Sequence, residues 1–123
     1  TGDLISGVAM AALASGAAVA AVRPKDTVKT QEGPGGSLRT PDRSSCWLAQ
    51  TPQAFRTEIL VGAMERAVRE GFQGTDDVSL VERLGGQVVI IEGSYGNIKI
   101  TTPGDLDIAE ILLKREEAGQ SLS

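Results

Sequence analysis

Between Thr57 and Glu70, apolar residues recur every three or four positions, which predicts an amphipathic helix that ends at Gly71. The same period appears near the start of the chain, where a helix capped by Asp3 is predicted to end at Gly16. The residues expected to face the core are Ile5, Val8, Ala9 and Ala12 in the first helix and Leu60, Ala63, Met64, Ala67 and Val68 in the second.

Two further helices are indicated by their start signals. Thr75-Asp76-Asp77 places acidic side chains where they suit a helix N-terminus, and Gly85-Gly86 ends that helix. Thr102-Pro103-Gly104-Asp105 combines an N-cap, a proline for the first helical position and an acid in the first turn. This last helix is predicted to run to about Glu117, before a frayed tail from Gly119 to Ser123. The expected core residues are Leu80, Val81 and Leu84, and then Leu106, Ala109, Leu112 and Leu113.

Three short segments have the patterns of strands. Ala17–Val22 and Val88–Ile91 are continuous apolar runs, and the second is expected to be buried on both faces. Within Asn97–Thr101, isoleucines alternate with Lys99, which predicts a strand that presents the lysine on the opposite face. Helices that alternate with apolar strands indicate an α/β layer structure.

From Asp26 to Arg43 the chain becomes polar, with Gly33-Pro34-Gly35-Gly36 near the middle. This composition predicts a two-stranded arm with a flexible tip, at approximately residues 26–43. Such an arm buries little of its own surface, so the alternatives are disorder or packing against another molecule. We favour packing against a second subunit.

Composition narrows the possible chemistry. The 123 residues, of which 41% are hydrophobic, are enough for one domain, and the net charge of -4 without a basic run argues against nucleic-acid binding. The apolar stretch from Leu4 to Val22 is interpreted as a helix plus a strand, not a membrane span. A single Cys46 and no histidine exclude an intramolecular disulfide and the usual Ser-His or Cys-His nucleophiles. Any reaction must therefore depend on positioning, electrostatics or a nucleophile that is already ionised.

Lys99 is the first candidate for contact with an anionic substrate. It is expected at the end of a strand and immediately before a helix start, where open α/β sheets bind ligands. The alternative is a solvated lysine on an edge strand. Neither G-x-x-x-x-G-K-[ST] nor G-x-G-x-x-G is present, so no motif in these residues binds a triphosphate, and no carboxylate cluster suggests a metal site.

Four polar segments occur in a characteristic order and spacing: Lys25-Asp26-Thr27-Val28-Lys29, Asp42-Arg43 leading to Ala49-Gln50-Thr51-Pro52-Gln53-Ala54-Phe55, Thr75-Asp76-Asp77, and Asn97-Ile98-Lys99-Ile100-Thr101-Thr102-Pro103. Together they resemble the 2-C-methyl-D-erythritol 4-phosphate cytidylyltransferase family. The likeness extends from about Asp3 to Leu113 and covers the C-terminal half of that family. It implies that residues 1–123 form the C-terminal part of one Rossmann-like nucleotidyltransferase domain with a projecting two-stranded arm.

The resemblance implies a reaction that joins CTP to methylerythritol phosphate, giving CDP-methylerythritol and pyrophosphate with the help of magnesium, in non-mevalonate isoprenoid biosynthesis. This reaction suits a chain without histidine, because the attacking phosphate oxygen is already largely ionised. Cations must then bring two anions together. The resemblance also implies a homodimer formed through the arm and a location in the bacterial cytoplasm or the plastid stroma, and we expect neither nucleic-acid nor membrane partners.

Five residues match site positions of the family. Arg43 and Lys99 are implied to orient the substrate phosphate, and Arg43, at the base of the arm, would serve the site of the neighbouring subunit. Thr27, Thr51 and Thr75 are implied to contact the substrate through hydroxyl or backbone groups. For each threonine, β-propensity or helix capping is the alternative role. No residue is assigned to a metal.

The family's Gly-rich triphosphate loop and its Asp-x-x-Arg-Pro segment are not found among these 123 residues. The chain alone is therefore expected to be inactive, or to act with a companion N-terminal chain. One alternative is a ribitol 5-phosphate cytidylyltransferase, which shares the Gln-Thr-Pro-Gln and Asn-Ile-Lys motifs, although the residues from Thr75 to Tyr95 favour the methylerythritol enzyme. A second alternative is a non-catalytic oligomerisation fragment.

Overall fold

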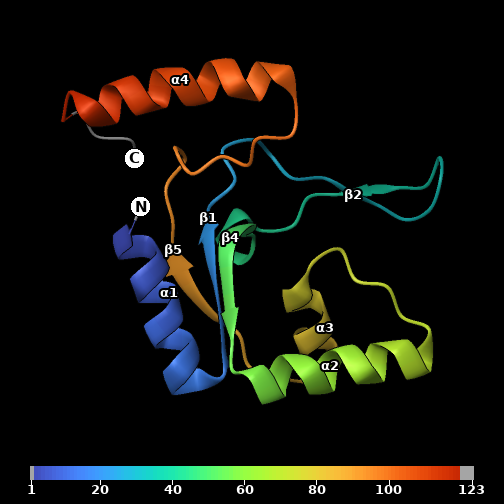
Figure 1. The fold of residues 1–123 in the computed structure, drawn as a ribbon. Coiled ribbons are helices and arrows are strands. Elements are labelled where there is room, and N and C mark those ends of the chain that lie inside the picture. The colour runs from blue at the N-terminus through green and yellow to red at the C-terminus, as the bar shows by residue number, and fades with distance from the viewer. Residues whose placement is uncertain (1, 120–123) are drawn as a thin grey trace.

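A three-stranded sheet forms the centre of the molecule (Figure 1). The computed structural model describes residues 2–119. The middle strand, β1 (Ala17–Val22), pairs antiparallel with β4 (Leu48–Phe55) on one side and parallel with β5 (Val89–Glu92) on the other. All six residues of β1 are buried. The predicted α/β class and the position of β1 are confirmed.

Helices cover both faces of β1, and successive β1 residues contact different helices. Ala18 and Ala20 join Val8 and Ala12 of α1 (Gly2–Ser15) in one buried cluster. Ala17 joins residues of two further helices, α2 (Thr57–Glu70) and α3 (Asp77–Arg83), in a second cluster. Since neighbouring residues of a strand point to opposite faces, α1 lies on one side of the sheet and α2 with α3 on the other.

The predicted helix ends at Gly16 and Gly71 are confirmed, and both glycines adopt positive φ angles of 104° and 65°. Asp3, the predicted cap of α1, instead lies within its first turn. Arg56, just before α2, donates its backbone N–H to the carbonyl of Gly16 at 2.8 Å. Its guanidinium donates to the carbonyl of Leu13, with Nε at 2.9 Å. The exposed carbonyls at the C-terminus of α1 thus gain donors from the start of α2.

Strand β4 was not among the predicted strands, and it contains a proline, which is unfavourable inside a regular strand. Its register against β1 shows how Pro52 is accommodated. Val19 is opposite Gln53 and Ala21 is opposite Ala49, so three residues of β4, from Gln50 to Pro52, lie opposite Ala20 alone. This is a bulge, in which the ladder is interrupted and the extra residues leave the plane of pairing.

The predicted two-stranded pairing of the arm is present. β2 (Thr30–Gln31) pairs antiparallel with β3 (Leu38–Arg39), and the hairpin projects away from the sheet (Figure 1). Lys29 Nζ donates to Thr40 Oγ1 at 2.6 Å and closes the base of the hairpin. A short 3-10 helix, Arg43–Ser45, follows the arm. The backbone N–H of Ser44 donates to its N-cap, Asp42, and lowers the pKa of that carboxyl group.

The last helix, α4 (Pro103–Glu117), has the predicted bounds and the predicted N-cap, Thr102. Its start is a full capping box, since the Asp105 N–H donates to Thr102 Oγ1 at 3.3 Å and Asp105 Oδ2 accepts from the Thr102 N–H at 2.9 Å. The Thr101 N–H also donates to Asp105 Oδ2, at 3.0 Å. These bonds fix the direction in which the chain enters α4.

The start of α4 is expected to loosen in acid. The Thr101 backbone N–H, followed by the groups of Thr102, holds the pKa of Asp105 below its usual value. The stabilisation is therefore present above the ordinary aspartate pKa of about 3.9 and is lost as the pH falls through the lower folded value. The measurement is the NMR shift of the Thr101 and Thr102 amide protons during an acid titration. A midpoint above the ordinary aspartate value would contradict the assignment, and Asp105→Asn should abolish the titration.

Several predicted core residues are exposed. Periodicity identifies the apolar face of a helix, but the packing partners decide which part of that face is covered. α2 packs mainly on α3, and only its small residues Ala63 and Ala67 are fully buried. α4 contacts no strand closely, so only Ala109 and Leu112 on its predicted face are half-buried. The predicted core residues that are exposed in the described structure are Ile5, Ala9, Met64, Val68, Leu106 and Leu113.

Two strand predictions need correction. β5 is not buried on both faces, because its residues alternate between half-buried and exposed and it lies at an edge of the described sheet. Residues 97–101 form no strand and belong to an irregular loop between β5 and α4. No strand pairs with residues 97–101, and the side-chain amides of Gln50 and Asn97 join this part of the loop to β4. The predicted tail lies, after Gly119, outside the described residues, and none of the described helices is long and apolar enough to span a membrane.

Candidate functional site

A cavity of about 400 Å³ opens at the bulge of β4. Three separate segments form its wall: the bulge, the N-terminus of α3, and the loop that joins β5 to α4. This volume is within the range of pockets that hold small ligands. The lining residues are Ala49, Gln50, Thr51, Gln53, Thr75, Asp76, Asn97 and Lys99.

The bulge places Thr51 in the wall of this cavity. In a regular strand, its N–H and C=O groups would continue the ladder with β1, but no β1 residue is registered opposite residues 50–52. The Thr51 carbonyl accepts a hydrogen bond from Asn97 Nδ2 at 2.6 Å instead. The Thr51 side chain is exposed and so available to a ligand.

The loop after β5 is fastened to the bulge by two side-chain amides. Gln50 Nε2 donates to the carbonyls of Ser94 at 2.9 Å and Asn97 at 3.3 Å. Asn97 Nδ2 donates in return to Gln50 Oε1 at 3.2 Å. Gly93 makes this approach possible, because a Cβ there would meet Gln50 Oε1 at 2.3 Å. Lys99 follows two residues after Asn97.

The N-terminus of α3 is joined to the same strand. Gln53 Nε2 donates to Asp76 Oδ2 at 3.2 Å, while Asp76 Oδ1 caps α3 by accepting from the Ser79 N–H at 2.8 Å. The Asp76 carboxylate therefore has donors on both oxygens. Thr75, immediately before the cap residue, is exposed at the cavity.

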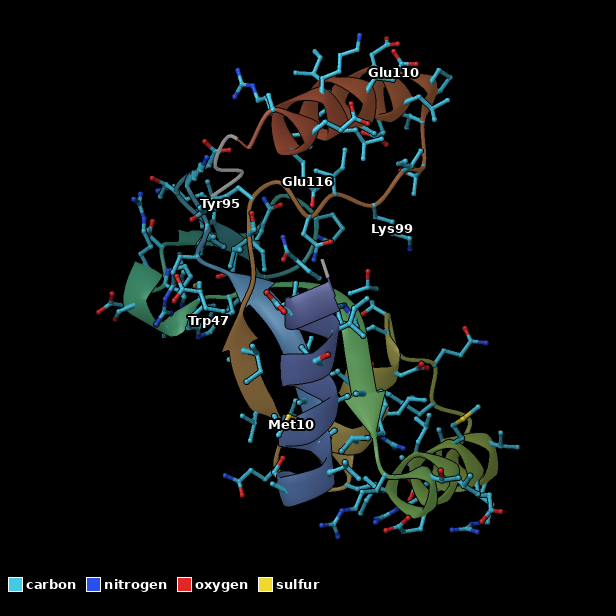
Figure 2. All side chains as sticks on the ribbon, turned by 60° about the vertical axis from the view of Figure 1, so that its left-hand side comes forward. Met10, Trp47, Tyr95, Lys99, Glu110 and Glu116 are labelled. Atoms are coloured by element: carbon cyan, nitrogen blue, oxygen red, sulfur yellow. The ribbon has the colours of Figure 1, made fainter. Side chains whose placement is uncertain are left out.

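The side chains at the cavity suit a phosphorylated, hydroxylated ligand. Lys99 is exposed, and within residues 2–119 no carboxylate lies within ion-pairing distance of it. Figure 2 shows its side chain extending away from the loop between β5 and α4. An ammonium group can bind phosphate oxygens, and the hydroxyl groups of Thr51 and Thr75 can donate to or accept from a polyol. The predicted residues Lys99, Thr51 and Thr75 are thus brought together.

Thr27 and Arg43 lie elsewhere. Thr27 lines a second cavity of about 300 Å³ with residues of the arm base and Tyr95. There Lys25 Nζ lies 4.0 Å from the centroid of the Tyr95 ring, and the Tyr95 hydroxyl donates to the Arg23 carbonyl at 2.8 Å. Arg43, in the short 3-10 helix, is exposed and lines neither cavity. One copy of the chain therefore does not unite all five predicted site residues.

Sequence reasoning gave no role to the residues that hold the cavity together. Gln50, Gln53 and Asn97 lie inside the motif segments, but their amides were not distinguished from other polar groups. Asp76 was recognised at a helix start, yet its bond to Gln53 joins residues that are far apart in the sequence. In the sequence, the only sign of this arrangement is that amide residues and threonines occur together in two of the motif segments.

No described group could serve as a metal site. Within residues 2–119, no three His, Cys, Asp or Glu side chains gather closely enough to hold an ion. The described residues therefore contain no ready-made set of protein ligands that would surround a magnesium ion by itself.

Comparisons with known proteins agree on one family. The family model of 2-C-methyl-D-erythritol 4-phosphate cytidylyltransferase (IspD) matches residues 1–115. A protein of that name from Syntrophus aciditrophicus is 53% identical over 117 residues, which are 95% of this chain and 50% of the relative. Another from Symbiobacterium thermophilum is 50% identical over 117 residues, which are 94% of this chain and 49% of the relative. The chain thus spans about half the length of these relatives.

Solved structures give the same result. The crystal structure of 2-C-methyl-D-erythritol 4-phosphate cytidylyltransferase from Thermus thermophilus is 40% identical, with a TM-score of 0.77 over 91% of this chain and 55% of that one. The 4-diphosphocytidyl-2C-methyl-D-erythritol synthase from Anaerococcus prevotii is 33% identical, with a TM-score of 0.82 over 92% of this chain and 51% of that one. The fold of the chain is therefore that of about half of a cytidylyltransferase of this kind.

Proposed function

Because this chain belongs to the 2-C-methyl-D-erythritol 4-phosphate cytidylyltransferase family, we propose that it forms the part of such an enzyme that holds the methylerythritol phosphate. The complete enzyme would transfer CMP from CTP to this substrate in isoprenoid biosynthesis, releasing pyrophosphate. The observation that supports this most is the cavity at which Thr51, Thr75 and Lys99 meet. Its one unpaired cation and its two hydroxyl groups match a phosphate joined to a polyol.

In the proposed mechanism, an ionised oxygen of the substrate phosphate attacks the α-phosphorus of CTP. The new P–O bond forms as the bond to the pyrophosphate breaks, and pyrophosphate leaves with that electron pair. No proton has to be removed from the nucleophile. The ammonium group of Lys99 offsets the repulsion between the two anions and fixes the direction of attack, while the threonines hold the polyol.

In this proposal, magnesium would bind together with the nucleotide. Magnesium ions commonly bind through substrate phosphates and one or two carboxylates. We assign none of the described residues to it, because none of them gather into a suitable cluster.

The site would be completed by a second subunit. Thr27 and Arg43 lie near the base of the arm and away from the cavity of their own chain. The projecting hairpin buries little of its own surface, which favours packing against another copy of the chain. In that homodimer, the Arg43 guanidinium and Thr27 would reach the substrate held by the partner.

The function is tested with the complete polypeptide that carries these residues. It should release pyrophosphate from CTP in the presence of methylerythritol phosphate, and much more slowly with ribitol 5-phosphate. Faster turnover of ribitol 5-phosphate would replace the proposed substrate by the alternative one. Absence of turnover with both, together with a stable dimer in sedimentation, would support the non-catalytic oligomerisation fragment.

The proposed location is the bacterial cytoplasm. The relatives compared above come from bacteria, which favours that compartment over the plastid stroma.

A further inference from the structure

We propose that Gln50 and Asn97 form a positioning pair that sets the place of the Lys99 ammonium group at the cavity. This inference rests on the proposed function and adds two residues that the motif comparison leaves without a role. Neither amide is assigned to contact the substrate. They would act through Lys99.

Every N–H donor of the two side-chain amides is used in a hydrogen bond. Each NH₂ group can donate twice, and all four N–H bonds have acceptors: Gln50 Nε2 bonds to the Ser94 and Asn97 carbonyls, and Asn97 Nδ2 bonds to Gln50 Oε1 and the Thr51 carbonyl. A rotation of either amide by 180° would set N–H against N–H or oxygen against oxygen. The pair therefore has one favourable arrangement, which it needs if it is to hold the Lys99 loop in one position.

The pair controls the segment that carries Lys99. This segment has no strand partner, and its two ends are fastened elsewhere: the Gly93 N–H donates to the Ala21 carbonyl at 2.8 Å, and Thr101 donates to Asp105. Between these ends, in the described structure, the bonds from Gln50 to Asn97 and from Asn97 to Thr51 are those that join residues 97–100 to the sheet. Without them, the nearest hydrogen bonds that fasten the loop on either side of Lys99 would be those of Tyr95, whose hydroxyl donates to the Arg23 carbonyl, and of Thr101.

Exposure explains why Lys99 needs such support. Its side chain is exposed and has no ion-pair partner among residues 2–119, so the loop backbone decides where the ammonium group can reach. A displacement of about 1 Å at a charged contact can lower a rate by tenfold to a hundredfold. Loss of the amide pair should therefore lower turnover even when the protein stays folded.

The test is Gln50→Met in the complete polypeptide, which keeps the length of the side chain without its hydrogen bonds or a new charge. We expect kcat/KM for CTP and methylerythritol phosphate to fall about tenfold. The control is Gln87→Met, at an exposed residue just before β5, which should leave turnover unchanged. An unchanged rate in Gln50→Met would overturn the proposal.

The Lys99→Ala background separates positioning from simple stabilisation. If Gln50 acts through Lys99, then Gln50→Met should produce little further loss when Lys99 is already alanine. The same tenfold loss in both backgrounds would show that Gln50 acts independently of Lys99 and would contradict the inference. An inactive wild-type polypeptide would refute the proposed function instead, so the two failures are distinguishable.

A second variant covers the case in which Gln50→Met does not fold. Gly93→Ala leaves both amides in the chain, but its Cβ would lie 2.3 Å from Gln50 Oε1 and would displace that amide. It should show the same loss of turnover and the same dependence on Lys99. Full activity in a folded Gly93→Ala variant that has a displaced amide would overturn the proposal.

Discussion

Replacement of Lys99 by alanine is expected to lower kcat/KM of the complete enzyme about 100-fold, which is the usual effect of losing one preorganised charge contact. Lys99 is the cation of the cavity, and within residues 2–119 it has no carboxylate partner whose loss could disturb the fold. The melting temperature should therefore hardly change. The two measurements are steady-state kinetics with methylerythritol phosphate and thermal unfolding by circular dichroism.

The matched control for this variant is Lys114→Ala. Lys114 is also exposed, but it lies in the last turn of α4 and away from the cavity. Its loss should change stability by a few tenths of a kcal/mol and leave the rate intact. Near-normal turnover in Lys99→Ala would exclude the role proposed for Lys99.

Replacement of Arg43 by alanine is expected to lower kcat/KM by a similar factor, about 100-fold. The physical reason differs, because Arg43 can bind a phosphate through two parallel N–H bonds and would do so from the partner subunit. Arg69→Ala removes another exposed arginine, in the last turn of α2, and serves as the control. It should turn over at the normal rate.

A mixture of the two inactive variants tests whether Arg43 acts across subunits. A dimer of one Lys99→Ala chain and one Arg43→Ala chain would have one site with both changes and one site with neither. Random exchange of subunits should then restore roughly a quarter of the wild-type activity. If both residues served the same chain, every site in the mixture would carry one change, and no activity would return.

Helix positions could be predicted from the sequence because their signals are local. Thr102, Pro103 and Asp105 form the predicted start of α4, and Gly71 ends α2 where the sequence placed its end. Each signal satisfies backbone groups within one turn of the helix, so it depends little on the rest of the fold. Burial was predicted less well, because Val68 and Leu113 lie on apolar faces that the described residues leave uncovered.

Strand positions depended on partners that the sequence does not reveal. β4 was not predicted, and Pro52, which is unfavourable in a regular strand, is accommodated there by a bulge opposite Ala20. Ile98 and Ile100 alternate with Lys99 as in a strand, but the structure offers this segment amide side chains in place of a second ladder. In both cases the hydrogen-bond partners, not the side-chain pattern, decided the conformation.

The cavity was predictable in part. Lys99 was identified from its place before a helix start, and the motif comparison gave Thr51 and Thr75. Their meeting at one cavity depends on pairing between β4 and β1 and on the Gln53–Asp76 bond, which connect distant parts of the chain. Such contacts have no signature in one sequence.

The bulge of β4 also protects the molecule from aggregation. β4 is an edge strand of the described sheet, and an exposed edge can pair with a strand of another chain. Here the edge is interrupted near its middle, since residues 50–52 depart from regular pairing and Pro52 has no N–H to donate. An incoming strand would find only two short stretches on which to form a ladder. The apolar segment Ala17–Val22, which would aggregate readily if exposed, is held between β4 and β5.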